Sequence, residues 1–349
     1  MDEPVGHGYH RRGEYITFKG QRIDLAGRED IKRFARHVGQ DLTICHDVDA
    51  DTFTALSEPY TKDQSSVYYK WISPGRFWVV TLPEADVGSF EVIGFNLARD
   101  ANAVWWYGSV LPGLDPSSVK VIKDGFVWKD TRHVWYQHQV IVGAKPDSFE
   151  HLEQAFYRDA ERVYWSSTPL PEADPKTFRT FGDDSAYGAD SSGVWWSCRR
   201  VEGVDSVSFR PIHQFVFVDA SGVYEAPGRL LDGADPQTFE KVADLDTFHT
   251  ALLRDADAHY VYLPFSGEVY RVEPGNASLR VSRTIWAGED APRRLAQVRA
   301  ELTEGAWSDP VVRLTGERGS RGLKSQEAHR LEIYREQFEK AWELVRQGR

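Results

Sequence analysis

The apolar and polar positions between Phe156 and Phe178 form a compact pattern, FYRDAERVYWSSTPLPEADPKTF. The run that ends at Arg158-Asp159 predicts a strand, and after a tight turn Val163-Tyr164-Trp165 predicts a second strand. A Pro-marked loop then leads to Ala173–Phe178, where the order Asp-Pro-x-Thr-Phe predicts one helical turn. We call this last segment the stop motif. The whole pattern predicts a β-hairpin that is closed by a short helical stop.

The chain repeats this pattern. An Asp lies four residues before a Val, and an aromatic residue follows the Val directly, in seven copies that begin at Asp63, Asp100, Asp130, Asp159, Asp190, Asp219 and Asp257. Between Asp100 and Asp219 the steps are 30, 29, 31 and 29 residues. Self-similarity at a nearly fixed period is typical of a repeat architecture. The sequence therefore predicts an all-β tandem array of about seven short β-hairpin repeats of roughly 30 residues, with a helical cap at its C-terminal end.

Roughly 30 residues is short for a four-stranded propeller blade, so we expect an open or superhelical stack. A closed, propeller-like toroid is the alternative. A β-sheet shared by the first and the last explicit repeats would indicate the closed form.

The residue types of the repeat have a physical reason. In the stop motif, the side chain of Asp174 can cap the free N–H groups of the next turn, and Pro175 fits the first helical position. Burying Phe178 would hold that turn on the sheet with roughly 1.5–3 kcal/mol. Asp159 lies in the hairpin turn, where its carboxylate can accept backbone N–H groups in an Asx-type arrangement.

Three regions are expected. Residues 1–59 form a degenerate N-terminal repeat region, in which residues before about 14 are a flexible lead, 16–23 turn at Gly20 as a hairpin, and Arg28–Val38 form one helix. Residues 60–285 form the β-repeat array. Residues 286–349 form the helical cap, with a first helix that starts at Glu289–Pro292 and a longer second helix at Ser325–Gln347. The first helix would carry Leu295, Val298 and Leu302 on one face, and the second would carry Leu331, Tyr334, Phe338, Ala341, Trp342 and Val345.

Composition narrows the classes of partner. The chain has 349 residues and a net charge of −11, which argues against nucleic acid and anionic lipid because both reward clustered Lys and Arg. The first residues, MDEPVGHGYHRRGEY, contain no apolar core of a signal peptide, and no apolar run reaches membrane length. Cys45 and Cys198 are isolated. We therefore expect a cytoplasmic protein in a reducing setting.

The segment Lys62-Asp63-Gln64-Ser65-Ser66-Val67-Tyr68-Tyr69 resembles the signature of the DKNYY repeat family, and the resemblance extends from Tyr60 to Val272. The family's Gly-Ala-Asp-Pro-x-Thr-Phe segment is kept at Gly233–Phe239 and, without its Gly, at Ala173–Phe178. Departures are Trp in place of Tyr (Trp105, Trp106, Trp195, Trp196), Lys145 in place of a stop-motif Asp, and Glu225 in place of an aromatic residue. The resemblance implies a bacterial repeat protein without established enzymatic activity, and some members look like immunity proteins encoded beside secreted toxins. It assigns no functional residue.

Metal, cofactor and catalytic sites find little support. Asp47, Asp49, Asp51 and Glu58 have the spacing of an EF-hand-like calcium loop, but Thr52 replaces the required Gly and the segment is also a copy of the stop motif. The pairs His133 with His138 and Cys45 with His46 have no third ligand nearby. No P-loop, G-x-S-x-G or G-x-G-x-x-G motif occurs. We therefore expect no metal, no cofactor and no enzymatic activity.

Tandem aromatic residues are the remaining candidates for binding. Neighbours in a strand point to opposite faces, so each pair divides between two environments. The first aromatic position is kept in all seven copies and the second changes to Glu225 and Leu263, so we expect the first to be more buried. The candidate binding residues are the second aromatics and an acidic pair in an exposed loop: Tyr69, Trp106, Tyr136, Trp165, Trp196, Asp183 and Asp184.

Two functions remain open. The first is a protein-binding module, most concretely an immunity protein that neutralises a basic toxin domain by charge complementarity. The alternative is a repeat protein that binds glycan or cell wall through a ladder of aromatic rings. The oligomeric state is left open.

Overall fold

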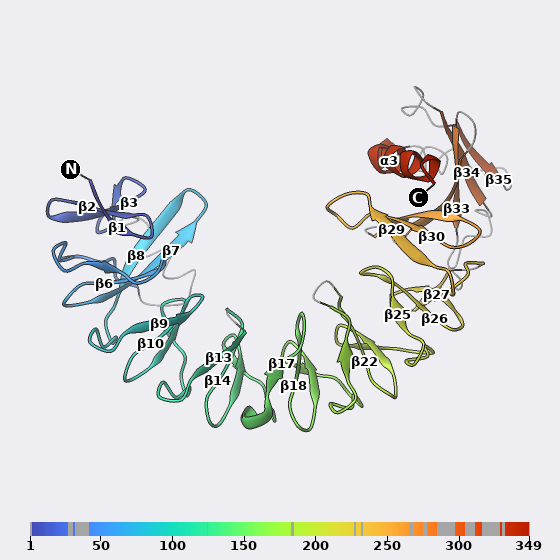
Figure 1. Cartoon of the computed structure of the whole chain (residues 1–349). Coiled ribbons are helices and arrows are strands. Elements are labelled where there is room, and N and C mark those ends of the chain that lie inside the picture. Colours follow the sequence, from blue (N-terminus) through green and yellow to red (C-terminus); the bar gives the residue numbers. More distant parts are fainter. Residues whose placement is uncertain are drawn as a thin grey trace. The chain divides into compact units, whose positions relative to one another are not determined.

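The computed structural model (Figure 1) describes residues 2–26, 31, 42–123, 125–182, 185–226, 228–231, 233–264, 268–274, 278–284, 297–303, 311–315, 329 and 332–348. The chain divides into two compact units, Met1–His151 (unit 1) and Leu152–Arg349 (unit 2). The region boundaries expected near residues 60 and 286 stay predictions.

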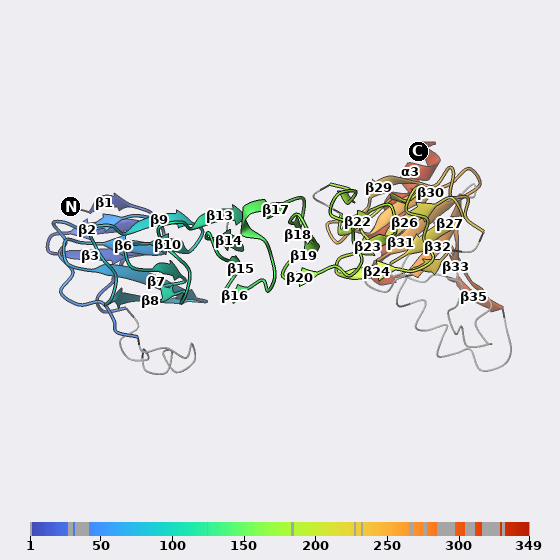
Figure 2. The same ribbon diagram turned by 90° about the horizontal axis from the view of Figure 1, so that it is seen from below.

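The described residues of unit 1 form four antiparallel sheets of four strands, and each sheet is formed by consecutive strands. Their strands are β1 (Glu3–Gly6), β2 (Tyr9–Arg12), β3 (Tyr15–Phe18) and β4 (Gln21–Arg22); β5 (Thr54–Ala55), β6 (Tyr60–Lys62), β7 (Val67–Ser73) and β8 (Arg76–Leu82); β9 (Glu91–Gly94), β10 (Leu97–Arg99), β11 (Val104–Trp106) and β12 (Ser109–Val110); and β13 (Lys120–Lys123), β14 (Val127–Lys129), β15 (Val134–Tyr136) and β16 (Gln139–Val140). The 3₁₀ turn η1 (Pro146–Ser148) and β17 (Glu150–His151) follow. Figure 2 shows β13 to β16 lying one beside the next in chain order.

Unit 2 continues the same plan and ends differently. It contains β18 (Phe156–Arg158), β19 (Val163–Trp165) and β20 (Thr168–Pro169); β21 (Arg179–Thr180), β22 (Tyr187–Ala189), β23 (Val194–Trp196) and β24 (Arg199–Val201); and β25 (Arg210–Pro211), β26 (Val216–Asp219), β27 (Gly222–Glu225) and β28 (Arg229–Leu230). Its last sheet has seven strands, namely β29 (Glu240–Asp244), β30 (Ala251–Arg254), β31 (His259–Leu263), β32 (Glu268–Pro274), β33 (Ser278–Thr284), β34 (Gln297–Thr303) and β35 (Val311–Thr315). The helix α3 (Arg335–Arg346) comes last.

The prediction of an all-β tandem array with a C-terminal helix is confirmed. Each repeat before the last forms its own small antiparallel sheet instead of a lone hairpin, because short strands flank the hairpin on both sides, and the last repeat lies in the seven-stranded sheet. The first and last explicit repeats lie in different sheets, so the described strands do not show the shared sheet expected of a closed toroid.

Neighbouring sheets within a unit pack through apolar side chains. Between the sheets β5–β8 and β9–β12, Phe90 lies 5.5 Å from the ring of Tyr60 and 6.3 Å from that of Trp105, measured between centroids. The apolar residue of the stop motif is buried throughout the described repeats, at Phe53, Phe90, Val119, Phe149, Phe178, Phe209 and Phe239. Its predicted role of holding the helical turn on the sheet is therefore confirmed.

One carboxylate organises each repeat. In Asp100, Oδ1 accepts the N–H groups of Asn102 and Ala103, each at 2.8 Å, and thereby closes the turn between the second and third strands. Its Oδ2 accepts the indole N–H of Trp105 at 2.9 Å and the backbone N–H of the stop-motif Asp86 at 3.0 Å. The same closing bonds to the second and third following residues occur at Asp63, Asp130, Asp159, Asp190, Asp219 and Asp255. The predicted Asx-type turn is confirmed.

The stop-motif Asp caps its own turn as predicted. Asp115 accepts the N–H of Ser117 at 2.9 Å and the hydroxyl of Ser118 at 2.7 Å. Asp174 accepts the N–H of Lys176 at 3.0 Å in the same way.

The last copy was assigned two residues too late. Asp255, and not Asp257, closes the turn, and the hydroxyl of Tyr260 donates to it at 3.0 Å, as the indole of Trp105 does to Asp100. Asp257 lies inside the turn and donates its own N–H to Asp255 at 2.9 Å. The sequence Asp-Ala-Asp offers two carboxylates, and only the first has the hairpin spacing to Tyr260.

The two ends of the chain differ from expectation. The expected flexible lead contains strands β1 and β2; β1 pairs with β2, and β2 pairs with β3, so both belong to the first sheet. The hairpin at Gly20 is confirmed by β3 and β4, whereas all but one residue of the expected helix Arg28–Val38 lie outside the described residues. The expected helix through Val298 and Leu302 is wrong, because these residues lie in β34, paired with β33 and β35.

The terminal helix behaves as the expected cap. Phe338, Ala341, Trp342 and Val345 on α3 are buried in one cluster with residues of the last sheet, such as Tyr270. The rings of Tyr270 and Phe338 meet edge to face at 5.5 Å.

The prediction on paired aromatics is confirmed in four copies. The first residue is buried and the second half-buried in the pairs Trp105-Trp106, Trp135-Tyr136, Tyr164-Trp165 and Trp195-Trp196. In the copy with Glu225 the order is reversed, because Glu225 is buried and Tyr224 is half-buried. Glu225 was expected to be exposed because burying an unpaired carboxylate is costly. This expectation is wrong, since Glu225 accepts a hydrogen bond from the hydroxyl of Tyr262 at 2.8 Å.

Candidate functional site

The two ends of the strands carry different chemistry. In an antiparallel sheet of four strands, the second turn lies at one end and the first and third turns lie at the other. In unit 1 we call the first of these ends the Asp edge, since it carries the turns that start at Asp63, Asp100 and Asp130, together with the stop motifs. We call the opposite end the aromatic edge of unit 1. It consists of residues in the first and third turns and of residues beside those turns, namely Trp71, Ile72, Phe95, Trp106, Tyr107, Phe126, Tyr136 and His138.

Rings on the aromatic edge form a continuous series across three sheets. Trp71 of β7 lies 6.3 Å from Tyr107, between ring centroids, and Tyr107 meets Trp106 edge to face at 4.9 Å. His138 of the next sheet stacks on Trp106 at 6.1 Å with an interplanar angle of 20°. These contacts arise because Tyr107 and Gln137 take a left-handed backbone conformation that reverses the chain in two residues.

Several side chains of this edge face solvent. Ile72 is 57% exposed, Phe95 62% and Phe126 46%. Sequence reasoning missed all three, because it followed the paired aromatics of the third strand and overlooked the turns. The available signal was an apolar residue next to a turn dipeptide, as in Gly125-Phe126 and Phe95-Asn96.

The predicted binding residues are only partly brought together. Trp106 and Tyr136 lie half-buried on the aromatic edge of unit 1. Tyr69 was expected to be exposed, and this is wrong, because it is buried between the second and third sheets and donates its hydroxyl to Asn96 Oδ1 at 3.0 Å. The reason is that β7 and β8 are long and extend beneath the next sheet's turn, where Gly108 lies against the Tyr69 ring.

In unit 2 the corresponding rings are also half-buried. Trp165 meets Phe156 edge to face at 4.7 Å, and Trp196 meets Phe215 at 6.1 Å. Asp183 and Asp184 lie outside the described residues.

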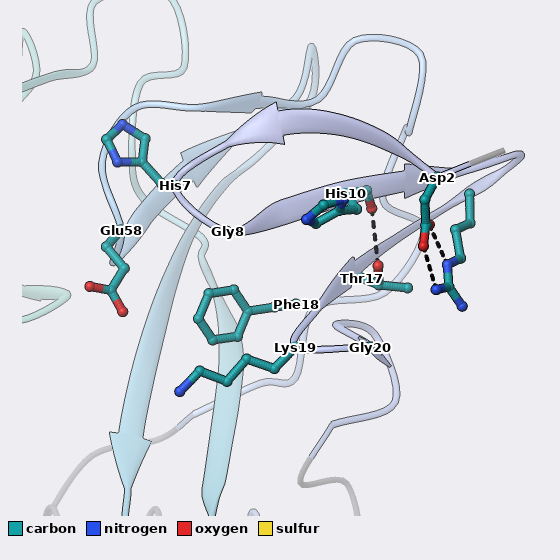
Figure 3. Close-up of a pocket in the computed structure, with 10 residues that line it drawn as sticks. Asp2, His7, Gly8, His10, Thr17, Phe18, Lys19, Gly20 and Glu58 are labelled. Atoms are coloured by element: carbon teal, nitrogen blue, oxygen red, sulfur yellow. Dashed lines mark hydrogen bonds and ion pairs between the residues drawn. The ribbon is translucent and has the colours of Figure 1, made fainter.

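A hollow of about 420 Å³ opens at the N-terminal end of unit 1 (Figure 3). It is lined by Asp2, His7, Gly8, His10, Arg12, Thr17, Phe18, Lys19, Gly20 and Glu58. The carboxylates of this lining already have cationic partners: Asp2 pairs with Arg12, and Glu58 receives Lys70 at 3.1 Å. The side chain of Lys70 is fully buried, and its ammonium lies 3.3 Å from the centroid of the Phe18 ring. Burial lowers the pKa of Lys70, against the opposing effect of Glu58.

A second hollow, of about 540 Å³, adjoins the first and shares Phe18 and Lys19 with it. It lies between the β3–β4 turn and the β7–β8 turn, so it belongs to the same end of the strands as the aromatic edge. The remaining lining residues are Gln21, Ile72, Ser73, Pro74, Gly75, Arg76 and Phe77.

The acidic side chains of the Asp edge are engaged in the fold. Burial would raise the pKa of Asp63, but hydrogen bonds from the Tyr68 hydroxyl and from the N–H groups of Asp49 and Ser65 bring that pKa below its ordinary value. Asp130 has a lowered pKa for the same reason, since the N–H groups of its own turn and of Asp115 outweigh burial. These carboxylates stay ionised because the backbone solvates them, which is a structural role.

The calcium-loop residues have other partners. Asp49 accepts the N–H of Asp51 at 2.9 Å and the hydroxyl of Thr52 at 2.8 Å, as a stop-motif Asp does, and Glu58 pairs with Lys70. Among the residues that the structure describes, no group of three His, Cys, Asp or Glu side chains could hold a metal ion. His133 and His138 lie exposed at opposite ends of β15.

One buried histidine stands out in unit 2. His213 lies 5.5 Å from Tyr262 and 6.1 Å from His249, between ring centroids. Burial, and next the positive charge of Lys241, lower its pKa from 6.5 to about 4, against the opposing charge of Asp244. The neutral imidazole is therefore the stable form in the folded chain.

In the described parts of the chain, no helix has the length and apolar character needed to cross a membrane. Comparison with curated proteins found no match, and comparison with solved structures found none either. The family model described as the DKNYY family matches residues 42–139 and again residues 129–264, together more than half of the chain. The matched residues begin in the segment that leads into the first explicit repeat and end after β31, in agreement with the repeating Asp turn. The chain therefore belongs to the DKNYY family.

Proposed function

We propose that this chain is a non-enzymatic protein-binding module, most concretely a cytoplasmic immunity protein that neutralises a toxin domain by covering it. The observation that carries the proposal is the aromatic edge of unit 1, where solvent-facing apolar side chains surround a continuous series of rings. Clustered aromatic anchors with a polar surround are the usual source of binding energy in protein interfaces.

The ring geometry supports a protein partner over a glycan. Sugar rings bind on an open aromatic face. On this edge His138 already stacks on Trp106, and Tyr107 meets the same indole edge to face, so this indole is partly covered by rings of the protein itself. Such a surface suits the mixed side chains of a protein.

Charge supports a basic partner. The net charge of −11 attracts a cationic protein over long range and raises its rate of association. Many nucleic-acid-degrading toxins are basic, so an acidic protein would be steered to them.

The test uses the gene next to this one. If it encodes a large secreted protein with a short variable C-terminal domain, that domain is expressed alone and together with this chain, and growth and co-purification are followed. We expect the intact chain to restore growth and to co-purify with the domain. Absence of both effects would refute the immunity proposal, and a stability shift with cell-wall oligosaccharide would then favour the glycan function.

Two matched variants locate the surface. Phe95→Ser with Phe126→Ser removes two exposed apolar side chains from the aromatic edge. Val142→Ser removes a more exposed one, 85% accessible, from the connection on the Asp edge of the same unit. We expect the first variant to lose protection and co-purification, and the second to keep both. Equal behaviour of the two variants would place the interface elsewhere.

A further inference from the structure

We infer that the aromatic edge of unit 1 binds an amphipathic α-helix of the partner protein, about fourteen residues long, through one apolar stripe of that helix. The inference rests on the proposed protein-binding function and names the structural element that the partner presents. Three features carry it: the length of the exposed apolar surface, the pairing of the turn backbones, and the rings that cover the central indole.

The exposed apolar side chains of the aromatic edge come from three successive sheets. Ile72 lies near the end of β7, Phe95 follows β9, and Phe126 precedes β14. An added Cβ on Gly125 would lie 3.3 Å from the Phe95 ring, so this ring reaches over the turn that contains Phe126. Because sheets that pack face to face lie about 10 Å apart, three sheets present a stripe of roughly 20 Å. A helix rises about 1.5 Å per residue and covers this stripe with about fourteen residues.

The backbone of these turns is already paired. The carbonyl of Asn96 accepts the N–H of Tyr107 at 2.9 Å and the hydroxyl of Tyr60 at 3.0 Å, and the carbonyl of Phe126 accepts the N–H of Gln137 at 2.7 Å. A peptide that joins a sheet as an added strand needs a row of free N–H and C=O groups along an edge strand, and turns at strand ends do not form such a row. A helix pairs its own backbone groups and needs only an apolar surface.

The rings of the edge also favour a helix over a polyproline segment. Proline-rich segments dock into grooves between aromatic rings. Here His138 stacks on Trp106, and Tyr107 meets the same indole edge to face, so the central indole is partly covered. Large apolar side chains at positions i, i+3 or i+4 and i+7 of a helix would instead pack against Phe95 and Phe126 on either side of these rings.

A phage-displayed library of random peptides, about sixteen residues long, tests the inference without assuming any conformation. The wild-type chain is used for selection. Enriched peptides are then measured by fluorescence anisotropy against Phe95→Ser/Phe126→Ser and against Val142→Ser/Val207→Ser. The control variant removes two apolar side chains that are 85% and 84% exposed and lie outside the aromatic edge. Circular dichroism and a thermal melt show that each variant is folded.

A second arm changes the peptide and does not depend on the folding of any variant of the chain. A central residue outside the apolar stripe is replaced by Pro in one peptide and by Ala in another. Pro breaks a helix, whereas Ala favours it. Circular dichroism of each peptide, alone and with the wild-type chain, follows its helicity.

We expect enriched peptides to carry Leu, Ile, Met or Phe at helical spacing and to gain helicity when they bind. Their affinity should fall by about tenfold or more with Phe95→Ser/Phe126→Ser and with the central Pro, and stay nearly unchanged with the control variant and with Ala. The inference is overturned if no peptide is enriched, if the enriched peptides are Pro-rich or have apolar residues at every second position, or if the two variants of the chain bind them equally well.

These outcomes separate from those of the proposed function. If the toxin domain co-purifies with the chain and the enriched peptides are not helical, only the present inference falls. If a helical consensus appears but no neighbouring protein is bound or neutralised, the aromatic edge is a helix-binding surface and the immunity function falls.

Discussion

Replacing Asp100 by Asn would test whether one carboxylate holds each repeat together. Its Oδ1 accepts two backbone N–H groups of the turn, and its Oδ2 accepts the indole N–H of Trp105 and the backbone N–H of Asp86. Asn keeps one acceptor oxygen and presents an NH₂ group in place of the other. In its better orientation the amide oxygen still accepts both N–H groups of the turn. The NH₂ group then points toward the indole N–H of Trp105 and the backbone N–H of Asp86, so these two buried donors lose their acceptor.

The magnitude follows from counting those donors. Hydrogen bonds to a charged group contribute roughly 1.5–3 kcal/mol each, so losing two predicts about 3–6 kcal/mol of destabilisation for Asp100→Asn. Asp130 is the matched control in the same unit. Among the described residues, its Oδ2 accepts one hydrogen bond, from the N–H of Asp115 at 3.1 Å, and the indole N–H of Trp135 has no hydrogen-bond partner. Asp130→Asn should therefore cost about 1.5–3 kcal/mol.

Urea unfolding followed by tryptophan fluorescence and by circular dichroism measures both variants. A double-mutant cycle with Trp105→Phe isolates the indole bond, since in that background Asp100→Asn should cost no more than Asp130→Asn. If Asp100→Asn and Asp130→Asn are equally destabilising, or if Trp105→Phe leaves the cost of Asp100→Asn unchanged, the count of donors does not explain the stability of the repeat.

The sequence predicted the repeat unit well because its determinants are local. Asp159 and the two N–H groups that it accepts lie within four residues, and the stop-motif Asp174 caps a turn of similar length. Such turn chemistry is encoded in the residue types themselves. The strand of Val163–Trp165 and the hairpin that contains it follow from the same few positions.

Non-local packing was harder to predict. Nothing near Tyr69 in sequence indicates that the Gly108 turn of the next sheet covers its ring. Glu225 was taken as a sign of exposure, but its partner is the hydroxyl of Tyr262, 37 residues later. Both errors have one cause: a half-buried position in one repeat is completed by the next, and its exposure depends on that neighbour.

The C-terminal error shows the limit of periodicity. Leu295, Val298 and Leu302 have helical spacing, yet the described part of that segment is strand β34, which extends the last sheet. Short apolar patterns are ambiguous between helix and strand, and pairing with a neighbouring strand decides between them. The aromatic edge has the same origin, because turns distant in sequence are brought to one end of the strands by the sheet.

Three further measurements address the remaining features. Trp105→Ala should destabilise the chain by about 3–5 kcal/mol and Trp106→Ala clearly less, because the first ring is buried and the second half-buried; the reverse order in urea unfolding would contradict this assignment. Gly188→Ala should cost about 1–3 kcal/mol by overpacking, since an added Cβ would lie 2.2 Å from the Phe178 ring, and Gly188→Ala with Phe178→Leu should recover part of the loss. His213 should make the chain less stable in mild acid. Its folded pKa of about 4 lies below the ordinary 6.5, so the unfolded state binds the proton first; stability is unaffected above about pH 6.5 and falls as the pH decreases toward 4. At pH 5 the loss is about 2 kcal/mol. Thermal unfolding of wild type and His213→Leu between pH 7.5 and 4.5 measures it, because the titration of all other groups is common to both proteins and the difference in stability loss belongs to the imidazole. If His213→Leu loses as much stability as the wild type across this interval, the imidazole is not the group that titrates.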